Sequence, residues 1–508
     1  MNFPELLGKQ AVKNPDKTAV VFRSSSVTFK QLSDYVSRLA NSLIDLGIKK
    51  GDRVAVYLPN CPEYIYSYLA IWAAGACAVP LDFMLTQDEL VSCISHSEAR
   101  ILIAKQKANS AFDTFADKCP GLNKIIICQT RENPGQAKGQ LLSFEELLKS
   151  AKDNLPQVKT EDKEYAIIFY TSGTTGKPKG VLINYRQLEA SPKAMKYFVD
   201  DDVKDGDLTL CSLPFSHLAG LIYIQANIVF GATIVLMERF SPLDFLKDIQ
   251  KYRISWFWLV PSMYYAFLQL KEFETFDLSS LRWLVIFGAP SSPEAMRRFH
   301  KHCPQAHLFH GWGLTETNAP TTVIPTGSAK IESVGRPAPW IEVKIFDDTD
   351  QEAGQGQVGE IAVRGWVVTE DYYKDPALTA QTMRSGWFHT GDLGRIDSQG
   401  YLYIVGRKKE MIKVSGEIVF EPEVESVIYK HPDVAEAAVI GVADKLRGEV
   451  PKAFIVPKEG RSLSEEVLRD FCRQHLAHFK IPRYFEFINS LPKNRTGKID
   501  KEKLRPSA

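Results

Sequence analysis

Short apolar segments alternate with helical stretches along much of the chain, and this alternation restricts the possible folds more than any other feature. Segment 28–46 carries its apolar residues at helical spacing, with Thr28 as the expected N-cap and Gly47 as the expected stop. Helices are also expected at 242–252 and 261–270, and strands at 52–58, 79–81, 101–104, 166–170, 208–213, 256–260 and 283–287. Helices and strands that alternate in this way predict an α/β fold with doubly wound parallel sheets.

Two uncharged stretches, Tyr64–Leu81 and Leu218–Met237, approach the length that spans a bilayer, which is about 20 residues. The first contains Gly75 and ends at Pro80–Leu81, and the second is divided by Gly231. Because glycine and proline interrupt a continuous helix, we expect each stretch to be a buried helix followed by a buried strand. The sequence therefore predicts no transmembrane segment.

The character of the chain changes twice in its second half. Residues 333–406 are rich in glycine, aspartate and short β-like runs, which predicts an antiparallel β subdomain that closes a large N-terminal domain of residues 1–406. Residues 407–508 then predict a small, mobile α+β domain, with helices near 422–429 and 465–475 and strands near 437–442 and 452–456. The 508-residue length is also that of a chain with two or three domains. A basic cluster at the boundary predicts a hinge near Lys409.

The composition excludes several classes of function. Apolar residues make up 44% and charged residues 24% of the chain, and the net charge of +1 provides no broad basic field for a nucleic acid. The eight cysteines are scattered, which is typical of reduced thiols and not of a zinc site or a disulfide framework. Neither end carries a signal peptide, a lipidation motif or a peroxisomal address, so we expect a cytoplasmic protein.

The loop after strand 166–170 consists only of hydroxyl residues, glycines, lysines and one proline. Its glycines let backbone amides approach a phosphate, its hydroxyls add donors, and its lysines add positive charge. The spacing is not that of a P-loop, because only two residues separate Gly173 from Gly176. We therefore expect a polyphosphate site of another kind, formed by Thr171, Ser172, Gly173, Thr174, Thr175, Gly176, Lys177, Pro178 and Lys179.

A second motif combines two glycines, an aromatic ring, hydroxyls and a carboxylate. Trp312 can stack on a flat ring, Thr315 can donate to a phosphate, and Glu316 can bind Mg²⁺ that bridges phosphates. On its own the motif also fits the capped start of a helix. Its residues are His310, Gly311, Trp312, Gly313, Leu314, Thr315, Glu316 and Thr317.

Together with two later motifs, these loops resemble the signatures of the adenylate-forming superfamily, which contains acyl-CoA synthetases, adenylation domains of peptide synthetases and beetle luciferases. The later motifs are Gly386–Asp392, with its Thr-Gly-Asp ending, and Leu491–Ile499, with its Gly-Lys ending. The matches extend over roughly residues 20–505. Two departures stand out: Trp312 replaces the usual tyrosine, and Pro422 lies one place later than usual.

The resemblance implies an ATP site and a catalytic lysine. Asp392 and Arg407 would bind the ribose, and Gly288, Ala289 and Pro290 would flank the adenine. Lys498 would be catalytic, since a cation that bridges the carboxylate and the α-phosphate lowers the barrier to joining two anions. The same resemblance implies that the C-terminal domain turns about Lys409 and brings a second set of residues to the site for the thioester step. This set is Lys413, Ser415, Gly416 and Glu417.

The resemblance also places the acyl pocket. The expected lining is His217, Leu218, Leu221, Val260, Phe287 and Thr317. His217 is expected at the junction of the acyl carbonyl and the CoA tunnel, with a packed core histidine as the alternative. No acid lies near Ser216 and His217 in the sequence, which disfavours an amino-acid substrate because a buried ammonium would be unpaired.

These features predict an acid–CoA ligase that forms AMP and uses ATP, Mg²⁺ and coenzyme A. A medium- or long-chain fatty acid is the expected substrate, and an aryl acid is the alternative. No carrier domain follows Lys498, and the intact Gly176–Lys177 pair also favours CoA over a carrier protein as acceptor. A luciferase-like oxygenase and an inactive nucleotide-binding regulator share the motifs. The joint presence of Lys498, Glu316 and Asp392 argues against the inactive protein.

Overall fold

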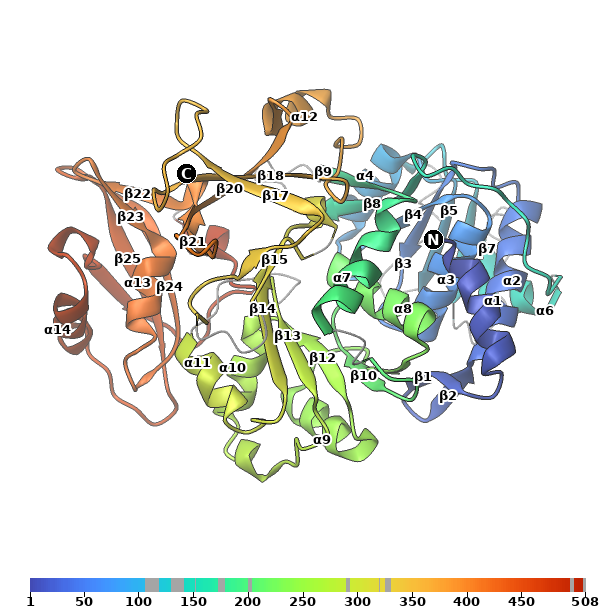
Figure 1. Ribbon diagram of the computed structural model, residues 1–508, viewed down its shortest axis with the longest axis horizontal. Coiled ribbons are helices and arrows are strands. Elements are labelled where there is room, and N and C mark those ends of the chain that lie inside the picture. The colour runs from blue at the N-terminus through green and yellow to red at the C-terminus, as the bar shows by residue number, and fades with distance from the viewer. Residues whose placement is uncertain are drawn as a thin grey trace.

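The chain forms four β-sheets with helices packed between and around them. The computed structural model describes residues 1–105, 118–128, 141–150, 152–171, 179–199, 203–288, 293–318, 320–324, 330–493 and 498–505. In Figure 1 the N-terminal part lies on the right, an antiparallel sheet lies at the top, and the C-terminal unit lies on the left.

A seven-stranded sheet carries the first half of the chain, in the order β7-β6-β5-β3-β4-β8-β9. All its neighbouring strands are parallel except β8 and β9, which form an antiparallel pair. The strands are β3 (Arg53–Tyr57), β4 (Cys77–Pro80), β5 (Ile101–Lys105), β6 (Lys124–Cys128), β7 (Leu141–Ser143), β8 (Tyr165–Thr171) and β9 (Lys179–Asn184). Its helices are α2 (Phe29–Asp45), α3 (Pro62–Ala73), α4 (Gln87–Ser97) and α6 (Phe144–Ser150).

A nine-stranded sheet follows, in the order β16-β15-β14-β13-β12-β10-β11-β1-β2. Its strands are β1 (Thr18–Phe22), β2 (Ser25–Thr28), β10 (Leu208–Cys211), β11 (Thr233–Leu236), β12 (Trp256–Leu259), β13 (Trp283–Ile286), β14 (His307–Trp312), β15 (Thr322–Val323) and β16 (Arg336–Pro337). Its helices are α1 (Phe3–Lys13), α7 (Ala190–Val199), α8 (Leu218–Phe230), α9 (Pro242–Tyr252), α10 (Pro261–Gln269) and α11 (Pro293–His300). The N-terminal strand β1 pairs in parallel with β11, so the start of the chain joins the sheet built by residues 208–337.

Both uncharged stretches are a buried helix followed by a buried strand, as predicted. Tyr64–Leu81 contains most of α3 and all of β4, and Leu218–Met237 contains α8 and β11. In the part of the chain that the structure describes, no helix has the length and apolar character needed to cross a bilayer. Helix α8 ends at Gly231, which takes a left-handed conformation with φ +70°.

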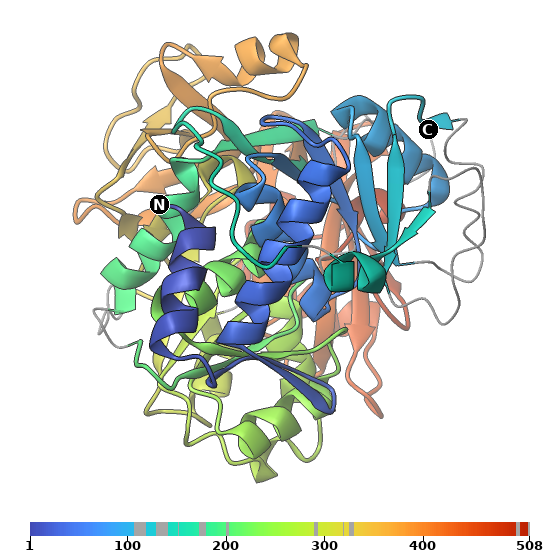
Figure 2. The ribbon, with the colours of Figure 1, turned by 90° about the vertical axis from the view of Figure 1, so that its right-hand side faces the viewer.

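The large hydrophobic core explains why α3 and α8 are apolar on all sides. One continuous cluster of buried residues joins α2, α3, α8 and both large sheets, and a second cluster covers the other face of the seven-stranded sheet. Figure 1 shows α8 between the two sheets, and Figure 2 shows the dark-blue N-terminal helices across the front of the turned view. A helix between two sheets contacts apolar surface all round.

The predicted antiparallel subdomain is a five-stranded sheet of order β17-β18-β20-β19, with β21 paired to β20. Its strands are β17 (Ile341–Phe346), β18 (Gly359–Gly365), β19 (Met383–Arg384), β20 (Trp387–Ile396) and β21 (Leu402–Arg407), and α12 (Pro376–Thr382) precedes β19. All its pairs are antiparallel. Strand β21 ends at Arg407, where the chain enters the C-terminal unit.

The C-terminal unit has an α+β fold and hydrophobic clusters of its own. Its sheet has the order β23-β22-β25-β24, with β26 parallel to β25. The elements are η5 (Lys408–Glu410), β22 (Met411–Val414), β23 (Glu417–Phe420), α13 (Glu421–Ile428), β24 (Val434–Asp444), β25 (Gly448–Pro457), α14 (Glu465–His475), η6 (His478–Lys480), β26 (Tyr484–Phe487) and η7 (Lys501–Leu504). The predicted fold class is thereby confirmed.

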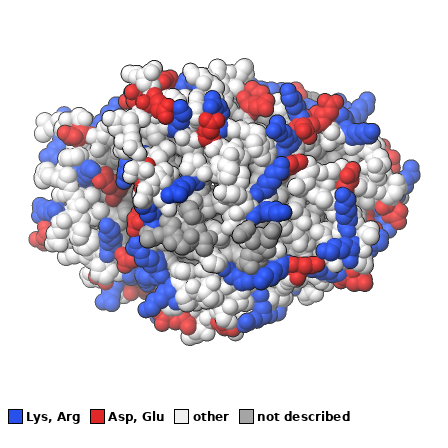
Figure 3. Space-filling model, viewed as in Figure 1, with Lys and Arg blue, Asp and Glu red and all other residues white. Residues whose placement is uncertain are grey.

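Basic and acidic side chains are interspersed over the face of the molecule shown in Figure 3. This distribution agrees with a sequence that has 62 basic and 61 acidic side chains. A surface of this kind generates no extended field of one sign on that face. An anion at this face would therefore be bound by a local cluster of side chains.

Candidate active site

The phosphate-loop prediction falls mostly outside the described residues. Residues 172–178 are not described, but the two residues that flank them are. Thr171 ends β8 and Lys179 begins β9, and the two are opposite each other in the antiparallel pair. The predicted phosphate loop therefore joins two adjacent strands. Ala289 and Pro290 of the expected adenine turn also lie outside the described residues.

Lys498 lies beside the turn that follows β13, although it comes from the far end of the chain. Gly288 in this turn has φ +97°, a left-handed conformation that favours glycine. A methyl group placed on Gly288 would lie 3.6 Å from Lys498 Cε and 3.9 Å from its Nζ. The lysine side chain is exposed to solvent. Surrounding protein and the nearby Arg407 lower the pKa of Lys498, and Asp392 opposes this shift.

Asp392 is held by two donors from two other strands. Its carboxylate is 4% exposed, Trp312 Nε1 donates to Oδ2 at 2.9 Å, and Arg407 Nε lies 2.7 Å from Oδ1. Burial raises the pKa of Asp392, whereas Arg407 and Trp312 lower it by favouring the charged form. The structure thus joins three residues of the predicted ATP site, from β14, β20 and β21. The hydrogen bond from Trp312 was not expected from the sequence.

Glu316 lies in a short 3₁₀ helix, η4 (Thr315–Thr317), directly after β14. Tyr372 donates its hydroxyl to Glu316 Oε1 at 2.8 Å, and the Thr369 amide donates to the Glu316 carbonyl at 2.7 Å. Among the residues that the structure describes, none donates a hydrogen bond to Oε2. A carboxylate with one oriented and one open oxygen fits Mg²⁺, which uses one or two carboxylates together with phosphate oxygens.

The remaining residues of the second motif support this arrangement. Thr317 is fully buried, and its hydroxyl accepts a hydrogen bond from the Leu314 amide at 3.0 Å. A methyl group on Gly311 would lie 2.2 Å from the Thr322 carbonyl oxygen and 2.6 Å from Phe287 Cζ, so only glycine fits there. Burial lowers the pKa of His310 to about 4, which makes the imidazole neutral at pH 7.

His217 is the N-cap residue of α8, at the end of a segment anchored by Asn60, whose side chain accepts from the Phe215 amide at 3.0 Å. No acidic residue is close to Ser216 and His217 in the sequence, as expected, but one is close to His217 in the structure. Asp82 Oδ2 is 3.5 Å from His217 Nε2, because the end of β4 lies next to the start of α8. The absence of a neighbouring acid therefore gives no ground for excluding an amino-acid substrate.

The predicted hinge and thioester residues lie in the C-terminal unit. Lys409 is in η5, and burial lowers the pKa of its ammonium group. Lys413 is in β22, and Ser415 and Gly416 form the tight turn to β23 with φ values of +52° and +90°. This turn and Glu417 are exposed, at the end of β22 away from the hinge. In this arrangement Lys498, and not the turn, lies beside Gly288.

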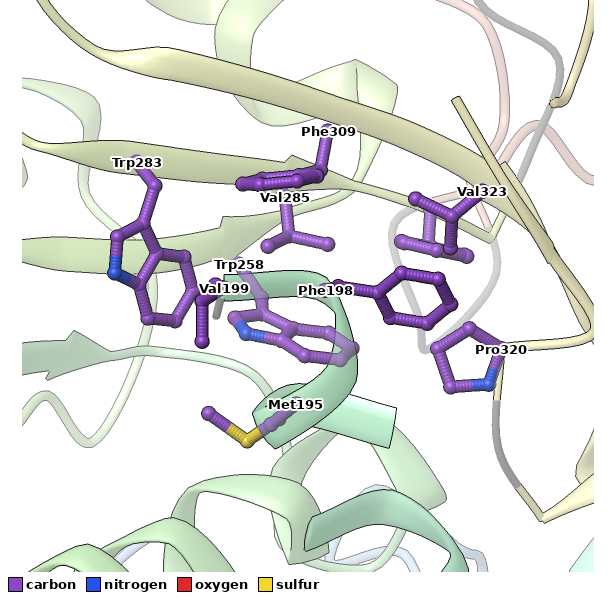
Figure 4. Close-up of a pocket in the computed structure, with 10 residues that line it drawn as sticks. Met195, Phe198, Val199, Trp258, Trp283, Val285, Phe309, Pro320 and Val323 are labelled. Atoms are coloured by element: carbon purple, nitrogen blue, oxygen red, sulfur yellow. The ribbon is translucent and has the colours of Figure 1, made fainter. Parts of the chain in front are cut away.

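A small apolar cavity lies next to Gly311 and Phe287, and about 20 Å³ of it is open to a water-sized sphere. Figure 4 shows side chains from α7 and from β12, β13, β14 and β15 around it. The lining residues are Met195, Phe198, Val199, Trp258, Trp283, Val285, Phe287, Phe309, Pro320 and Val323. Trp258 and Phe287 stack with ring centroids 5.7 Å apart and planes at 21°. Such a wall suits a flat or chain-like apolar group.

Of the six residues predicted to line the acyl pocket, Phe287 lines this cavity. Leu221 and Thr317 are buried, and Leu218, Val260 and His217 are partly exposed, but none of these five is in its lining. The sequence motifs did not indicate the other nine lining residues. The aromatic run Trp256–Phe257–Trp258 was the available signal, since alternate residues of a strand face the same side.

The chain matches two families of known proteins. Residues 7–373 match the AMP-binding enzyme family, and residues 423–498 match the AMP-binding enzyme C-terminal domain. The long-chain-fatty-acid–CoA ligase of Bacillus subtilis (strain 168) is 32% identical, over 98% of this chain and 93% of that protein.

Solved structures resemble the whole chain. The anthranilate CoA ligase AuaEII in complex with anthranoyl-AMP has a TM-score of 0.91 and 28% identity, and the match covers 99% of this chain and 96% of that one. The o-succinylbenzoate coenzyme A synthetase of Bacillus subtilis in complex with ATP and magnesium ion has a TM-score of 0.82 and 28% identity, over 97% and 98% of the two chains.

Proposed function

Because this chain belongs to the AMP-binding enzyme family, we propose that it joins a carboxylic acid to coenzyme A in two steps driven by ATP. The observation that carries the proposal is the position of Lys498 beside Gly288 and within electrostatic reach of the Asp392–Arg407–Trp312 group. The site thereby contains a cation, Lys498, for the two reacting anions, and a carboxylate, Asp392, for the ribose.

In the first step an oxygen of the acid attacks the α-phosphorus of ATP. The bond between that phosphorus and the bridging oxygen of the β-phosphate breaks, and pyrophosphate leaves with the electron pair. Lys498 stabilises the charge that develops between the two anions. In the second step the thiol of coenzyme A loses its proton to water and attacks the acyl carbonyl, the bond to AMP breaks, and AMP leaves.

The other predicted residues have supporting roles in this proposal. Asp392 accepts the ribose hydroxyls, Trp312 stacks on the adenine side, and the loop between Thr171 and Lys179 binds the β- and γ-phosphates. Glu316 would bind Mg²⁺, which supplies positive charge to the phosphates of ATP. The solved relative in complex with ATP and magnesium ion supports this assignment.

For the second step we propose that residues 407–508 rotate against residues 1–406 about a hinge near Lys409. The rotation would withdraw Lys498 and bring the turn of Ser415 and Gly416 to the site, where a residue without a side chain leaves room for the narrow thiol arm. His217 would lie near the acyl carbonyl. The separate hydrophobic clusters of the C-terminal unit support its movement as one body.

The cavity supports an apolar acid, because every residue of its lining is apolar or aromatic. With about 20 Å³ open to a water-sized sphere, it sets no chain length for that acid. The stacked Trp258 and Phe287 rings favour the aromatic acid. A solved relative bound to anthranoyl-AMP supports this choice.

The test is AMP release from ATP with a panel of acids: acetate, benzoate, coumarate, octanoate and palmitate. We expect release only when acid, Mg²⁺ and coenzyme A are all present, with benzoate or coumarate well above acetate. Formation of ADP in place of AMP would contradict the reaction. Octanoate or palmitate as the best acid would contradict the preference for an aromatic acid and leave the reaction intact.

A further inference from the structure

A buried charged cluster in the C-terminal unit includes a residue of the segment that carries Lys498. Lys501, three residues after Lys498, points its ammonium between two carboxylates of α13: its Nζ is 2.8 Å from Glu421 Oε2 and 2.7 Å from Glu425 Oε1. Glu421 is 1% exposed and Lys501 17% exposed. Glu425 Oε1 also accepts a hydrogen bond from the Val439 amide at 2.8 Å. The cluster therefore attaches the segment that carries Lys498 to α13 and β24.

The shifted proline of the sequence explains the place of Glu421. Helix α13 begins at Glu421, with Phe420 as N-cap and Pro422 within its first turn. A carboxylate in the first turn interacts favourably with the positive end of the helix. Here it also turns inward, against η7. With the proline at 422, an acidic side chain begins α13 and, like Glu425, contacts the segment after Lys498.

We propose that Glu421 is a positioning residue for the adenylation step, holding Lys501 so that Lys498 reaches the turn at Gly288. The inference rests on the proposed function. Glu421 is not a catalytic residue, because it contacts Lys501 and not the reacting groups. Two carboxylates around one ammonium restrict its position more than one does, and the short link between Lys501 and Lys498 transmits this restriction. A shift of about 1 Å in a catalytic group can reduce a rate 100-fold.

Burial of the Glu421 charge costs free energy of folding, which argues that the cluster does more than stabilise the fold. Burial raises the pKa of Glu421 to about 7, even though Lys501 lowers it. The groups that face Glu421 are Lys501 and Arg505 from the C-terminal segment, Glu425 from α13, and Glu410 from η5. A carboxyl whose folded pKa exceeds its unfolded value loses stability as the pH rises between the two values. At pH 8 the ionised Glu421 therefore does not improve folding.

The direction of the Glu421 pKa shift distinguishes a positioning role from a structural one. Glu421→Gln removes the charge and keeps the volume, so the variant should melt at the same temperature as the wild type, or higher, at pH 8. Lys501 retains Glu425 as its partner. Glu423→Gln is the matched control: it is on the same helix, and its carboxylate pairs at the surface with Lys480 at 2.7 Å. That pair does not contact the Lys498 segment.

The experiment measures the two half-reactions separately in the full-length protein. Acid-dependent exchange of labelled pyrophosphate into ATP reports the first step, and thioester formation from the preformed acyl-adenylate reports the second. For Glu421→Gln we expect about a tenfold lower kcat of exchange with unchanged KM for ATP and an unchanged second step. Glu423→Gln should equal the wild type, and Glu421→Asp, which keeps the charge, should recover part of the rate.

The pH profile adds a second readout. In the wild type the exchange rate should fall as the pH drops through about 7, where Glu421 gains a proton, and this limb should be absent in Glu421→Gln. A full exchange rate in Glu421→Gln, or an equal loss in both half-reactions, would overturn the positioning role. Absence of exchange in the wild type would instead overturn the proposed function, and the positioning role with it.

Discussion

Replacement of Trp312 by phenylalanine tests the group that binds the nucleoside in this account. The variant keeps an aromatic ring but loses the indole N–H, which donates to Asp392 Oδ2 at 2.9 Å. The acceptor is a carboxylate that is 4% exposed, so water cannot easily replace the lost donor. A hydrogen bond to a charged group contributes about 1.5–3 kcal/mol.

If that energy holds Asp392 in position to bind the ribose, loss of the hydrogen bond weakens ATP binding. At about 1.36 kcal/mol for each factor of ten, the KM for ATP should rise about 10- to 150-fold. The ribose is remote from the bond that forms, so kcat should change much less. The assay is acid-dependent pyrophosphate exchange at varied ATP.

The pH dependence provides a second check on Trp312→Phe. Trp312 lowers the pKa of Asp392, so its loss raises that pKa further. The KM for ATP should therefore start to rise at a higher pH in the variant than in the wild type as the solution is acidified.

Trp340→Phe is the control, because the Trp340 indole N–H has no hydrogen-bond partner among the described residues. A KM for ATP within twofold of the wild type in Trp312→Phe, or an equal rise in Trp340→Phe, would refute the reasoning.

Three further substitutions have defined outcomes. Lys498→Met should lower the exchange rate about 10²- to 10³-fold, as loss of a charge-stabilising donor does elsewhere, with little change in ATP affinity measured by equilibrium dialysis. Because the pKa of Lys498 is lowered, the wild-type rate should decline as the pH rises through a value below 10.5, and Lys498→Met should lack this decline. Gly311→Ala places a methyl group 2.2 Å from the Thr322 oxygen and should lower the Tm through overpacking of about 1–3 kcal/mol. Tyr372→Phe frees Glu316 Oε1 and should raise the Mg²⁺ concentration needed for ATP binding, measured by calorimetry; an unchanged requirement would remove Tyr372 from the account.

Local patterns in the sequence were sufficient to predict many of the elements. Thr28 caps α2 with a reciprocal pair of bonds to Gln31, which is why the start of that helix was predictable. Helix α9 begins and ends at the predicted residues, because Pro242 suits a helix start. The two uncharged stretches were interpreted correctly, because their glycines and prolines mark the break between helix and strand.

Contacts between distant segments were not predictable in this way. The pairing of β1 with β11 joins residues about 200 positions apart, and no short-range pattern reports it. The approach of Asp82 to His217 and the bond from Tyr372 to Glu316 arise only when several elements pack together. The same holds for the apolar cavity, whose lining comes from α7 and several strands of the nine-stranded sheet.

The sequence motifs nevertheless indicated the residues of the site better than the predicted helices and strands did. Lys498, Gly288, Trp312, Asp392 and Arg407 come from five separate places in the sequence, and the structure brings them close together. The role of each residue stays a prediction. The lining of the apolar cavity, apart from Phe287, was not indicated by the motifs, because packing determines it and apolar side chains carry no motif.

The central claim is that the chain forms an acyl-adenylate, and exchange of labelled pyrophosphate into ATP in the absence of coenzyme A tests it most directly. The account predicts exchange that requires both Mg²⁺ and an acid that fits the cavity, and that is largely lost in Lys498→Met. Exchange that is independent of the acid, or absent with every acid of the panel while the protein still binds ATP, would contradict the claim.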